Sequence, residues 1–302
     1  MAESPPLIFD IHRFALDDGP CIRTTVFFKG CPLACAWCHN PEAIKSEREL
    51  AFYPDRCIRC GACATVCPEA AISGSPAPQI DRSRCSCCGT CADSCPATAL
   101  QMIGKAYTHR ELLELVLRDR HFFTVSGGGV TFSGGEPTLR MDYVSAALRA
   151  LKAEGLHTAI QTCGLFAYDD FARHILPFVD LIMFDLKFID AGEHLLHTGQ
   201  DNATILENFR RLARAAGDRI LPRVALVPGM TATAKNLLEI ASFLAESGCQ
   251  RCDLLSYNPA GAAKRRAIGM DPVPGLPEQP LSPAEEDELR RLFFDRLTQC
   301  GI

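Results

Sequence analysis

Residues 57–96 contain a cysteine pattern that occurs twice, and this repeat constrains the fold more than any other feature of the chain. Each copy has the spacing Cys-x-x-Cys-x-x-Cys-x-x-x-Cys-Pro, and the copies are offset by 28 positions. The first contains Cys57, Cys60, Cys63 and Cys67, and the second contains Cys85, Cys88, Cys91 and Cys95. The chain has 17 cysteines, and this odd number excludes a fully paired disulfide framework. We therefore expect the repeated thiols to bind metal.

This spacing is that of bacterial two-cluster ferredoxins, in which the fourth Cys of each run ligates the other [4Fe–4S] cluster. One predicted ligand set is Cys57, Cys60, Cys63 and Cys95, and the other is Cys67, Cys85, Cys88 and Cys91. A structural zinc site is the alternative, but it would need eight ligands to match the doubled spacing by accident. Cys87 breaks the symmetry of the repeat, and we predict that it is not a ligand.

Three more cysteines precede the repeat, in the segment Gly30-Cys31-Pro32-Leu33-Ala34-Cys35-Ala36-Trp37-Cys38-His39. Three thiolates can hold a four-iron cluster while one iron keeps an open position for a substrate or cosubstrate. A structural zinc site fits this spacing poorly, because no fourth Cys lies nearby. We predict that Cys31, Cys35 and Cys38 hold a catalytic cluster.

The composition excludes several classes of protein. The chain has 302 residues, 47% of them hydrophobic and 22% charged, which suffices for one large core with a small insert. The net charge of −5 shows no basic excess, so we expect no nucleic-acid partner. The sequence has neither about 18 consecutive apolar residues nor a secretory signal, so we expect a cytoplasmic protein without a membrane partner.

Outside the repeat, short apolar runs alternate with amphipathic segments, which is typical of a parallel sheet covered by helices. We predict six strands, at residues 22–28, 130–133, 158–162, 181–186, 220–227 and 252–257. We predict helices at residues 142–154, 168–176, 202–216 and 234–247, and capping boxes at Thr108 and Ser282 begin two more. The expected fold class is α/β, a partial (β/α)6 TIM-like barrel with an inserted bacterial-type two-cluster ferredoxin domain. The barrel would comprise residues 1–45 and 105–302, and the insert residues 46–104.

Such folds place their chemistry at the carboxyl ends of the strands. The loop of Cys31 follows the first predicted strand, and Gly134, Gly135 and Glu136 follow the second. We expect the two glycines to let the backbone approach a ligand, and Glu136 to receive an ammonium group.

The three-Cys loop, the Ser133-Gly134-Gly135-Glu136-Pro137 turn and the six-unit alternation resemble the radical S-adenosylmethionine (SAM) enzymes. Three further motifs are similar to those of the activating enzymes of glycyl radical enzymes, in particular the subgroup with a two-cluster insert. These motifs are Asp18-Gly19-Pro20-Cys21-Ile22-Arg23-Thr24, Cys38-His39-Asn40-Pro41-Glu42 and Asp185-Leu186-Lys187. The resemblance covers nearly the whole chain.

The resemblance implies a reaction and its cofactors. The open iron would chelate SAM, and reductive cleavage would give methionine and a 5′-deoxyadenosyl radical. This radical would abstract a hydrogen from a backbone glycine of a partner glycyl radical enzyme. The cofactors would be SAM and three [4Fe–4S] clusters, reduced by an electron donor of the flavodoxin or ferredoxin type.

The resemblance also assigns residues to the parts of SAM. Gly134, Gly135 and Glu136 would receive the methionine ammonium, and Arg223 would lie near the carboxylate. The ribose and methionine portions would lie near Asp185, Leu186 and Lys187, and the nucleoside near Asn258 and the backbone of Trp37, Cys38 and His39. The glycine loop of the partner would contact Asp18, Gly19, Pro20 and Arg23.

Three positions depart from the family pattern. Cys21 stands where the family usually has glycine, and Asn258 where some relatives have His. Gln161 replaces a carboxylate beside Thr162, Met183 and Asp185, positions that bind a monovalent cation in pyruvate formate-lyase activating enzyme. One fewer charge weakens the attraction for a cation, so we do not assign a cation site.

The remaining thiols are Cys163, Cys249, Cys252 and Cys300, which we expect to be packing residues. A redox pair of Cys249 and Cys252 is a weaker alternative. Two other functions stay open at this point. The chain could be a radical SAM enzyme for a small molecule, or an electron-transfer protein that uses only the insert, which leaves the three-Cys loop unexplained.

Overall fold

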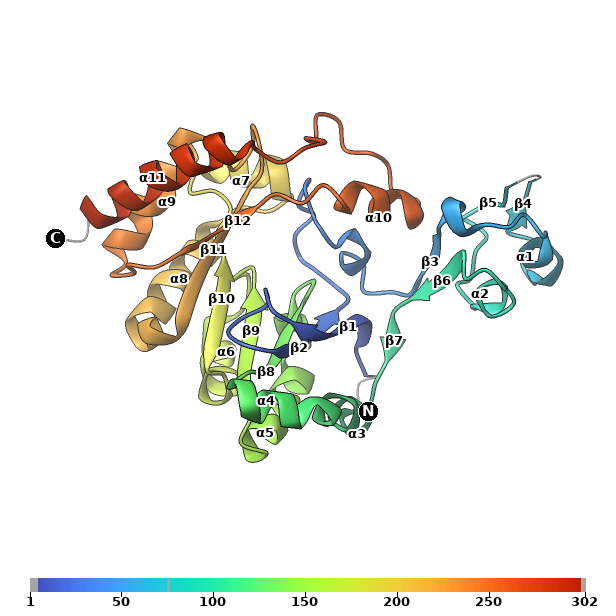
Figure 1. Cartoon of the computed structure of the whole chain (residues 1–302), viewed down its shortest axis with the longest axis horizontal. Coiled ribbons are helices and arrows are strands. Elements are labelled where there is room, and N and C mark those ends of the chain that lie inside the picture. Colours follow the sequence, from blue (N-terminus) through green and yellow to red (C-terminus); the bar gives the residue numbers. More distant parts are fainter. Residues whose placement is uncertain (1–4, 75–76, 300–302) are drawn as a thin grey trace.

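An eight-stranded sheet organises the larger part of the chain, in the computed structural model that describes residues 5–74 and 77–299 (Figure 1). The strand order is β12-β11-β10-β9-β8-β2-β1-β7. The strands are β1 (Leu7–Ala15), β2 (Arg23–Phe28), β7 (Lys105–Ala106), β8 (Gly129–Gly134), β9 (His157–Thr162), β10 (Leu181–Asp185), β11 (Ile220–Leu226) and β12 (Asp253–Ser256). The run from β2 to β12 is parallel, and it contains all six predicted strands. Cys300 lies outside the described residues.

The two strands beyond β2 in the sheet were not predicted. Strand β1 is antiparallel to β2, and β7 is antiparallel to β1. Most side chains of β1 are at least partly exposed, so this segment lacks the continuous apolar run of the central strands. The two residues of β7 are both exposed.

Helices cover one face of the sheet and supply most of the core. They are α3 (His109–Val116), α4 (Arg120–Ser126), α5 (Met141–Ala153), α6 (Tyr168–His174), α8 (Ala203–Ala216), α9 (Ala234–Glu246) and α11 (Pro283–Gln299). The capping box at Thr108 is present, with hydrogen bonds in both directions between Thr108 and Glu111. The predicted helix 168–176 ends earlier, at His174, because Pro177 follows in a 3-10 turn.

The two faces of the sheet differ because side chains alternate along each strand. Val26, Phe132, Ile160, Phe184 and Val224 belong to the large apolar core under the helices. The intervening positions form a chain of polar contacts across the other face, and they include Arg23, Thr131, Ser133, Gln161, Met183, Asp185 and Arg223. The central strands are therefore apolar on the helix side only.

A smaller lobe, at the right of Figure 1, is formed within residues 49–103. It contains the antiparallel pairs β3 (Glu49–Phe52) with β6 (Leu100–Ile103) and β4 (Ile72–Ser73) with β5 (Gln79–Ile80), and the helices α1 (Ala62–Val66) and α2 (Thr90–Asp93). Its core consists of Leu50, Ile72, Cys91 and Leu100. Because Glu49 pairs with Ile103, the chain enters and leaves the lobe at one place.

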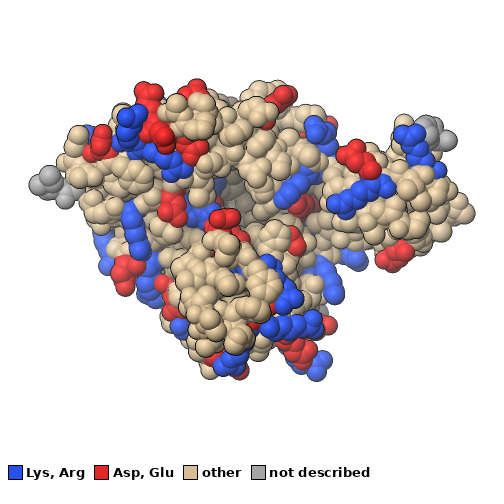
Figure 2. Space-filling view, viewed as in Figure 1, with Lys and Arg blue, Asp and Glu red and all other residues tan. Residues whose placement is uncertain are grey.

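The surface carries charges of both signs, and acidic and basic side chains are interspersed over the face shown in Figure 2. None of the helices within residues 5–74 and 77–299 has both the length and the apolar character needed to cross a bilayer.

Candidate active site

The loop of Cys31, Cys35 and Cys38 follows β2 and is held from two sides. On one side, the backbone NH of Gly30 donates to Ala43 at 2.7 Å, and that of Cys31 to Ile44 at 3.0 Å. On the other, Ala34 and Ala36 donate at 2.8 and 2.9 Å to carbonyls at the end of helix α7 (Ala191–Thr198). The spacing of the three thiols is therefore set by main-chain contacts as well as by the motif.

The three thiols lie in an apolar surrounding. Trp37 packs edge-on against Phe188 at 5.9 Å between ring centroids, and Phe188 stacks on His197 at 5.4 Å. Burial raises the pKa of the Cys31 thiol, and it raises that of Cys38 to about 12. Metal-free thiols here are therefore neutral, and cluster assembly must release their protons.

The glycines of the turn after β8 pack against the loop that contains Cys31. Gly135 donates its NH to Phe28 at 2.8 Å, and Glu136 donates to Gly30 at 2.7 Å. A Cβ atom on Gly134 would lie 2.2 Å from the Phe28 nitrogen, and one on Gly135 would lie 2.1 Å from the Gly30 oxygen. Glycine is thus required for contact between two backbones, whereas the sequence analysis expected only contact with a ligand.

The carboxylate of Glu136 points into the protein and is fully buried. It accepts from the Thr138 NH at 3.1 Å and hydroxyl at 2.8 Å, from the Thr162 hydroxyl at 2.9 Å, and from the Cys163 NH at 2.7 Å. These four donors occupy the roughly four acceptor positions of a carboxylate. Glu136 therefore joins the ends of β8 and β9, and its role as the ammonium acceptor stays a prediction.

The two cysteine runs of the lobe surround two cavities. One cavity, of about 120 Å³, is lined by Cys57, Cys60, Cys63 and Cys95. A narrower one is lined by Cys67, Cys85, Cys87, Cys88 and Cys91. Among residues 5–74 and 77–299, no three Cys, His, Asp or Glu side chains are placed to hold a single metal ion. The thiols are spread around cavities, as a multi-atom cluster requires.

The backbone of the lobe repeats with the cysteines. Positive φ angles recur 28 positions apart, at Arg59 (60°) and Cys87 (53°), Gly61 (76°) and Gly89 (94°), and Ala70 (45°) and Thr98 (49°). Cys87 thus occupies the position of Arg59, which has no thiol. This equivalence supports the prediction that Cys87 is not a ligand, although its side chain borders the second cavity.

Comparison with known proteins identifies the family. Residues 82–244 match the model of the Radical SAM superfamily, and residues 50–73 match that of a 4Fe-4S binding domain. The isethionate sulfite-lyase activating enzyme of Desulfovibrio desulfuricans is 39% identical over 298 residues, covering 96% of this chain and 95% of that one. The trans-4-hydroxy-L-proline dehydratase activating enzyme of Clostridioides difficile is 39% identical over 294 residues, covering 95% and 96%.

The chain belongs to the radical SAM superfamily. Within it, the chain is one of the activating enzymes of glycyl radical enzymes, as the resemblance predicted. A radical SAM methyltransferase from Sphaerobacter thermophilus has a similar fold, with a TM-score of 0.50 and 17% identity, covering 97% of this chain and 75% of that one.

The strand ends of this radical SAM enzyme bring several predicted residues together. The Lys187 ammonium lies 3.8 Å from Asp185, which accepts from the Gln161 amide at 3.4 Å. Burial lowers the pKa of Lys187, but the negative charge of the nearby Asp185 carboxylate raises it, and the net shift is upward. The Lys187 ammonium is therefore a fixed positive charge next to the cysteine loop.

Arg223 has a free donor at this site. One of its terminal nitrogens contacts the Met183 sulfur at 3.1 Å. Its Nε is buried and has no hydrogen-bond partner within residues 5–74 and 77–299. A buried donor without a partner is costly, so this atom fits an anionic ligand such as a carboxylate. Asn258 follows β12 and is exposed, and its side-chain oxygen accepts from Ala260 at 3.0 Å.

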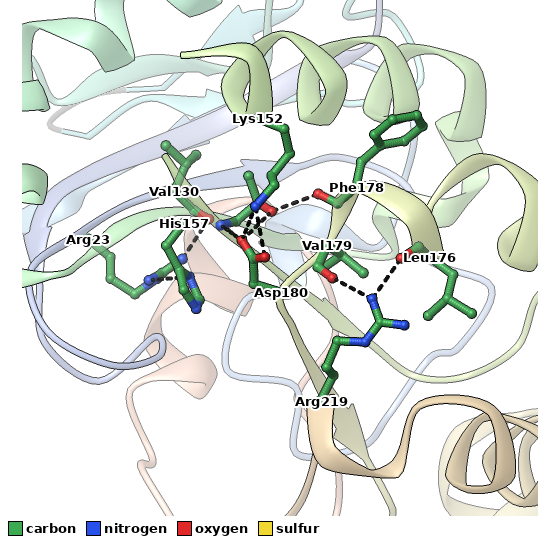
Figure 3. Close-up of polar contacts among 10 residues, drawn as sticks. Arg23, Val130, Lys152, His157, Leu176, Phe178, Val179, Asp180 and Arg219 are labelled. Carbon is green, nitrogen blue, oxygen red and sulfur yellow. Dashed lines mark hydrogen bonds and ion pairs between the residues drawn. The ribbon is translucent and has the colours of Figure 1, made fainter. Parts of the chain in front are cut away.

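Arg23 is not a surface residue, and the prediction that it contacts the partner is wrong. It is fully buried and donates to the Thr131 hydroxyl at 2.6 Å, the Val130 carbonyl at 2.7 Å and the Pro20 carbonyl at 3.3 Å. Burial lowers the pKa of Arg23 to about 10. Figure 3 shows it beside His157, at the edge where Asp180 accepts from Lys152.

The segment Asp18-Gly19-Pro20 is attached near the amino ends of β2 and β8, beside Arg23. The Thr131 hydroxyl donates to the Asp18 carbonyl at 2.7 Å, and a Cβ atom on Gly19 would lie 2.9 Å from Arg23. This segment precedes β2, and six residues at about 3.3 Å each separate it from the end of β2 that leads to Cys31. Cys21 is exposed with φ of 64°, a conformation that explains the usual glycine there.

We expect Arg23→Met to lower the free energy of unfolding by about 3 kcal/mol, because the acceptors on Thr131 and Val130 lose a buried charged donor. Urea denaturation of the purified protein measures this. Arg173→Met is the matched control, because the Arg173 side chain is 68% exposed. Equal stability of the two variants would contradict the assigned role of Arg23.

Two short helices contribute residues that the sequence analysis missed. Carbonyls of helix α7 accept the two hydrogen bonds from the cysteine loop. Helix α10 (Gly261–Ala267) packs on the other end of this loop, at Cys38. A Cβ atom on Gly261 would lie 2.3 Å from the Cys38 oxygen, and Lys264 donates to Asn40 at 2.7 Å. Gly261 after Pro259 was the available signal, but Gly and Pro together also indicate an ordinary loop.

Proposed function

We propose that Cys31, Cys35 and Cys38 hold the [4Fe–4S] cluster at which this activating enzyme binds and cleaves SAM. The observation that carries this proposal is the packing of the three-Cys loop against the Gly134–Gly135 turn and helix α7, next to the charges of Lys187 and Arg223. The bound cluster would supply one electron to the sulfonium, and the resulting 5′-deoxyadenosyl radical would abstract hydrogen from a partner's backbone glycine.

The protein would orient SAM through groups at the strand ends. The buried Nε of Arg223 would donate to its carboxylate, and the backbone of Gly134 and Gly135 would meet its ammonium. Asp185 and Lys187 would bind the ribose and methionine portions, and the backbone of Trp37, Cys38 and His39 would pass the adenine. Leu186 is buried and donates its NH to Arg223 at 2.9 Å, so it would position Arg223.

We further propose that the sheet forms a partial (β/α)6 barrel from residues 1–45 and 105–302, with a two-cluster insert at residues 46–104. The two cavities support the crossed ligand sets, because each is lined by cysteines of both runs. With the catalytic site, the chain would hold three clusters. An electron donor of the flavodoxin or ferredoxin type would reduce them.

The partner would be a glycyl radical enzyme. The relatives named above activate different enzymes, an isethionate sulfite-lyase and a trans-4-hydroxy-L-proline dehydratase. Their similar identity to this chain does not favour either partner.

The test uses anaerobically reconstituted protein with dithionite and SAM. We expect 5′-deoxyadenosine by chromatography, and a glycyl radical signal by electron paramagnetic resonance (EPR) when the cognate glycyl radical enzyme is added. No 5′-deoxyadenosine would exclude the reaction. If 5′-deoxyadenosine forms but no tested glycyl radical enzyme gains a radical, a small-molecule substrate becomes the better proposal.

We expect SAM cleavage to proceed equally in sodium and potassium buffers. The Gln161 amide donates to the Asp185 carboxylate, and it takes the place of a cation that would otherwise bind this carboxylate. Gln161→Asp would place two carboxylates together, and in buffers with only large organic cations its activity should fall about tenfold, equivalent to roughly 1.4 kcal/mol. Sodium or potassium should restore the variant. A cation requirement of the unchanged protein would contradict this role of Gln161.

A further inference from the structure

Helix α10 touches the catalytic loop with its first turns. A Cβ atom on Gly261 would lie 2.3 Å from the Cys38 oxygen. Lys264 donates to Asn40 at 2.7 Å and lies 3.4 Å from the Glu42 carboxylate. The amino end of α10 is therefore fixed on the backbone that follows Cys38.

The other end of α10 touches the lobe. Arg82, between the two cysteine runs, donates to the Leu50 carbonyl of β3 at 2.8 Å and to the Ala267 carbonyl of α10 at 3.1 Å. Gly269 lies against the Arg82 side chain, since a Cβ atom there would lie 1.9 Å from its Nε. Beside this contact, Ala51 packs with Ala267 and Ile268 in a small apolar cluster. Helix α10 thus contacts both the lobe and the catalytic loop (Figure 1).

The two cavities lie in order along the strands β3 and β6. Leu50 and its cross-strand partner Met102 line the cavity of Cys67, Cys85, Cys88 and Cys91. Phe52 and its partner Leu100, which are farther from the place where the chain enters and leaves the lobe, line the cavity of Cys57, Cys60, Cys63 and Cys95. Arg82 contacts the backbone of Leu50, so α10 is joined to the lobe beside the first of these cavities.

We infer that α10 and Arg82 form a joint that holds the lobe against the catalytic loop. Of the two cavities of the lobe, the one lined by Cys67, Cys85, Cys88 and Cys91 is the nearer to this joint. Arg82 is a positioning residue, since it acts through Leu50 and Ala267. The inference rests on the proposed cluster sites. It explains why a guanidinium stands here, because one planar group donates to two carbonyls on different elements.

Hydrogen–deuterium exchange on the reconstituted full-length protein tests the joint. Arg82→Ala should speed exchange at least tenfold in both residues 50–53 and residues 261–268. Arg84→Ala is the matched control, because the Arg84 side chain donates to the Glu69 carbonyl within the lobe, and it should leave residues 261–268 unchanged. Gly269→Ala should resemble Arg82→Ala, whereas Arg82→Lys should restore part of the protection. Faster exchange confined to the lobe, or equal effects of Arg82→Ala and Arg84→Ala, would overturn the inference.

EPR of the reduced protein tests the order of the sites with a readout that a purely structural role would not change. Cys60 and Cys88 are equivalent in the repeat, so Cys60→Ala and Cys88→Ala form a matched pair. We expect the nearer cluster of the lobe to broaden the EPR signal of the catalytic cluster through magnetic interaction. Cys88→Ala should remove this broadening, whereas Cys60→Ala should retain it. Arg82→Ala should weaken the broadening at unchanged iron content. The opposite order would overturn the inference. Failure of SAM cleavage alone would reject the proposed function, and the exchange experiment would still decide on the joint.

Discussion

Cys35→Ala is expected to reduce formation of 5′-deoxyadenosine by at least about 1000-fold, because the reaction has no comparable route without the cluster. Cys35 is buried, and its loop is fixed by hydrogen bonds to α7. Anaerobic turnover assays and iron analysis measure the effect. The protein should lose the iron of one cluster and keep that of the lobe.

Cys163→Ala is the matched control for this experiment. Cys163 is also buried and lies near Cys31 and Glu136, but it is not one of the three cysteines of the motif. We expect the variant to keep its iron and most of its activity. Turnover by Cys35→Ala, or loss of iron from Cys163→Ala, would show that the catalytic ligand set is wrong.

Glu136→Gln is expected to lower the free energy of unfolding by about 2–4 kcal/mol. The carboxylate accepts four hydrogen bonds, and the NH2 group of the new amide would face at least one of the groups that donate them. The turn that carries Gly134 and Gly135 should loosen, so SAM should bind more weakly. Urea denaturation and SAM titration measure the two effects.

Glu207→Gln serves as the control, since the Glu207 side chain is 58% exposed and pairs with Arg210 on its own helix. It should change neither stability nor SAM binding. If Glu136→Gln weakened SAM binding without any loss of stability, its carboxylate would contact SAM after all, as the sequence analysis expected.

The central strands could be predicted because their short apolar runs alternate with amphipathic helices. Strand β1 could not, because a strand with mostly exposed side chains has no such run. Helices α7 and α10 are short, and their positions depend on contacts with the cysteine loop rather than on an amphipathic pattern.

The motifs predicted which loops meet, but not where each side chain points. Glu136 was expected to face a ligand, yet its neighbours on β9 supply donors that no motif encodes. Arg23 was assigned to the partner surface because it lies in a shared motif. Arg23 lies two positions before Thr25 on β2, so both side chains are on the same face of the sheet, opposite to Val26. This spacing was the available signal that Arg23 faces the polar side of the sheet, where it is buried.

The two cavities of the lobe have a consequence for how such a segment can change during evolution. Cys95 completes the cavity of the first cysteine run, and Cys67 completes that of the second. With the proposed crossed ligand sets, deletion of either half of the 28-residue repeat would leave both sites incomplete. Because each site takes cysteines from both halves, we expect that related proteins gain or lose the two sites together.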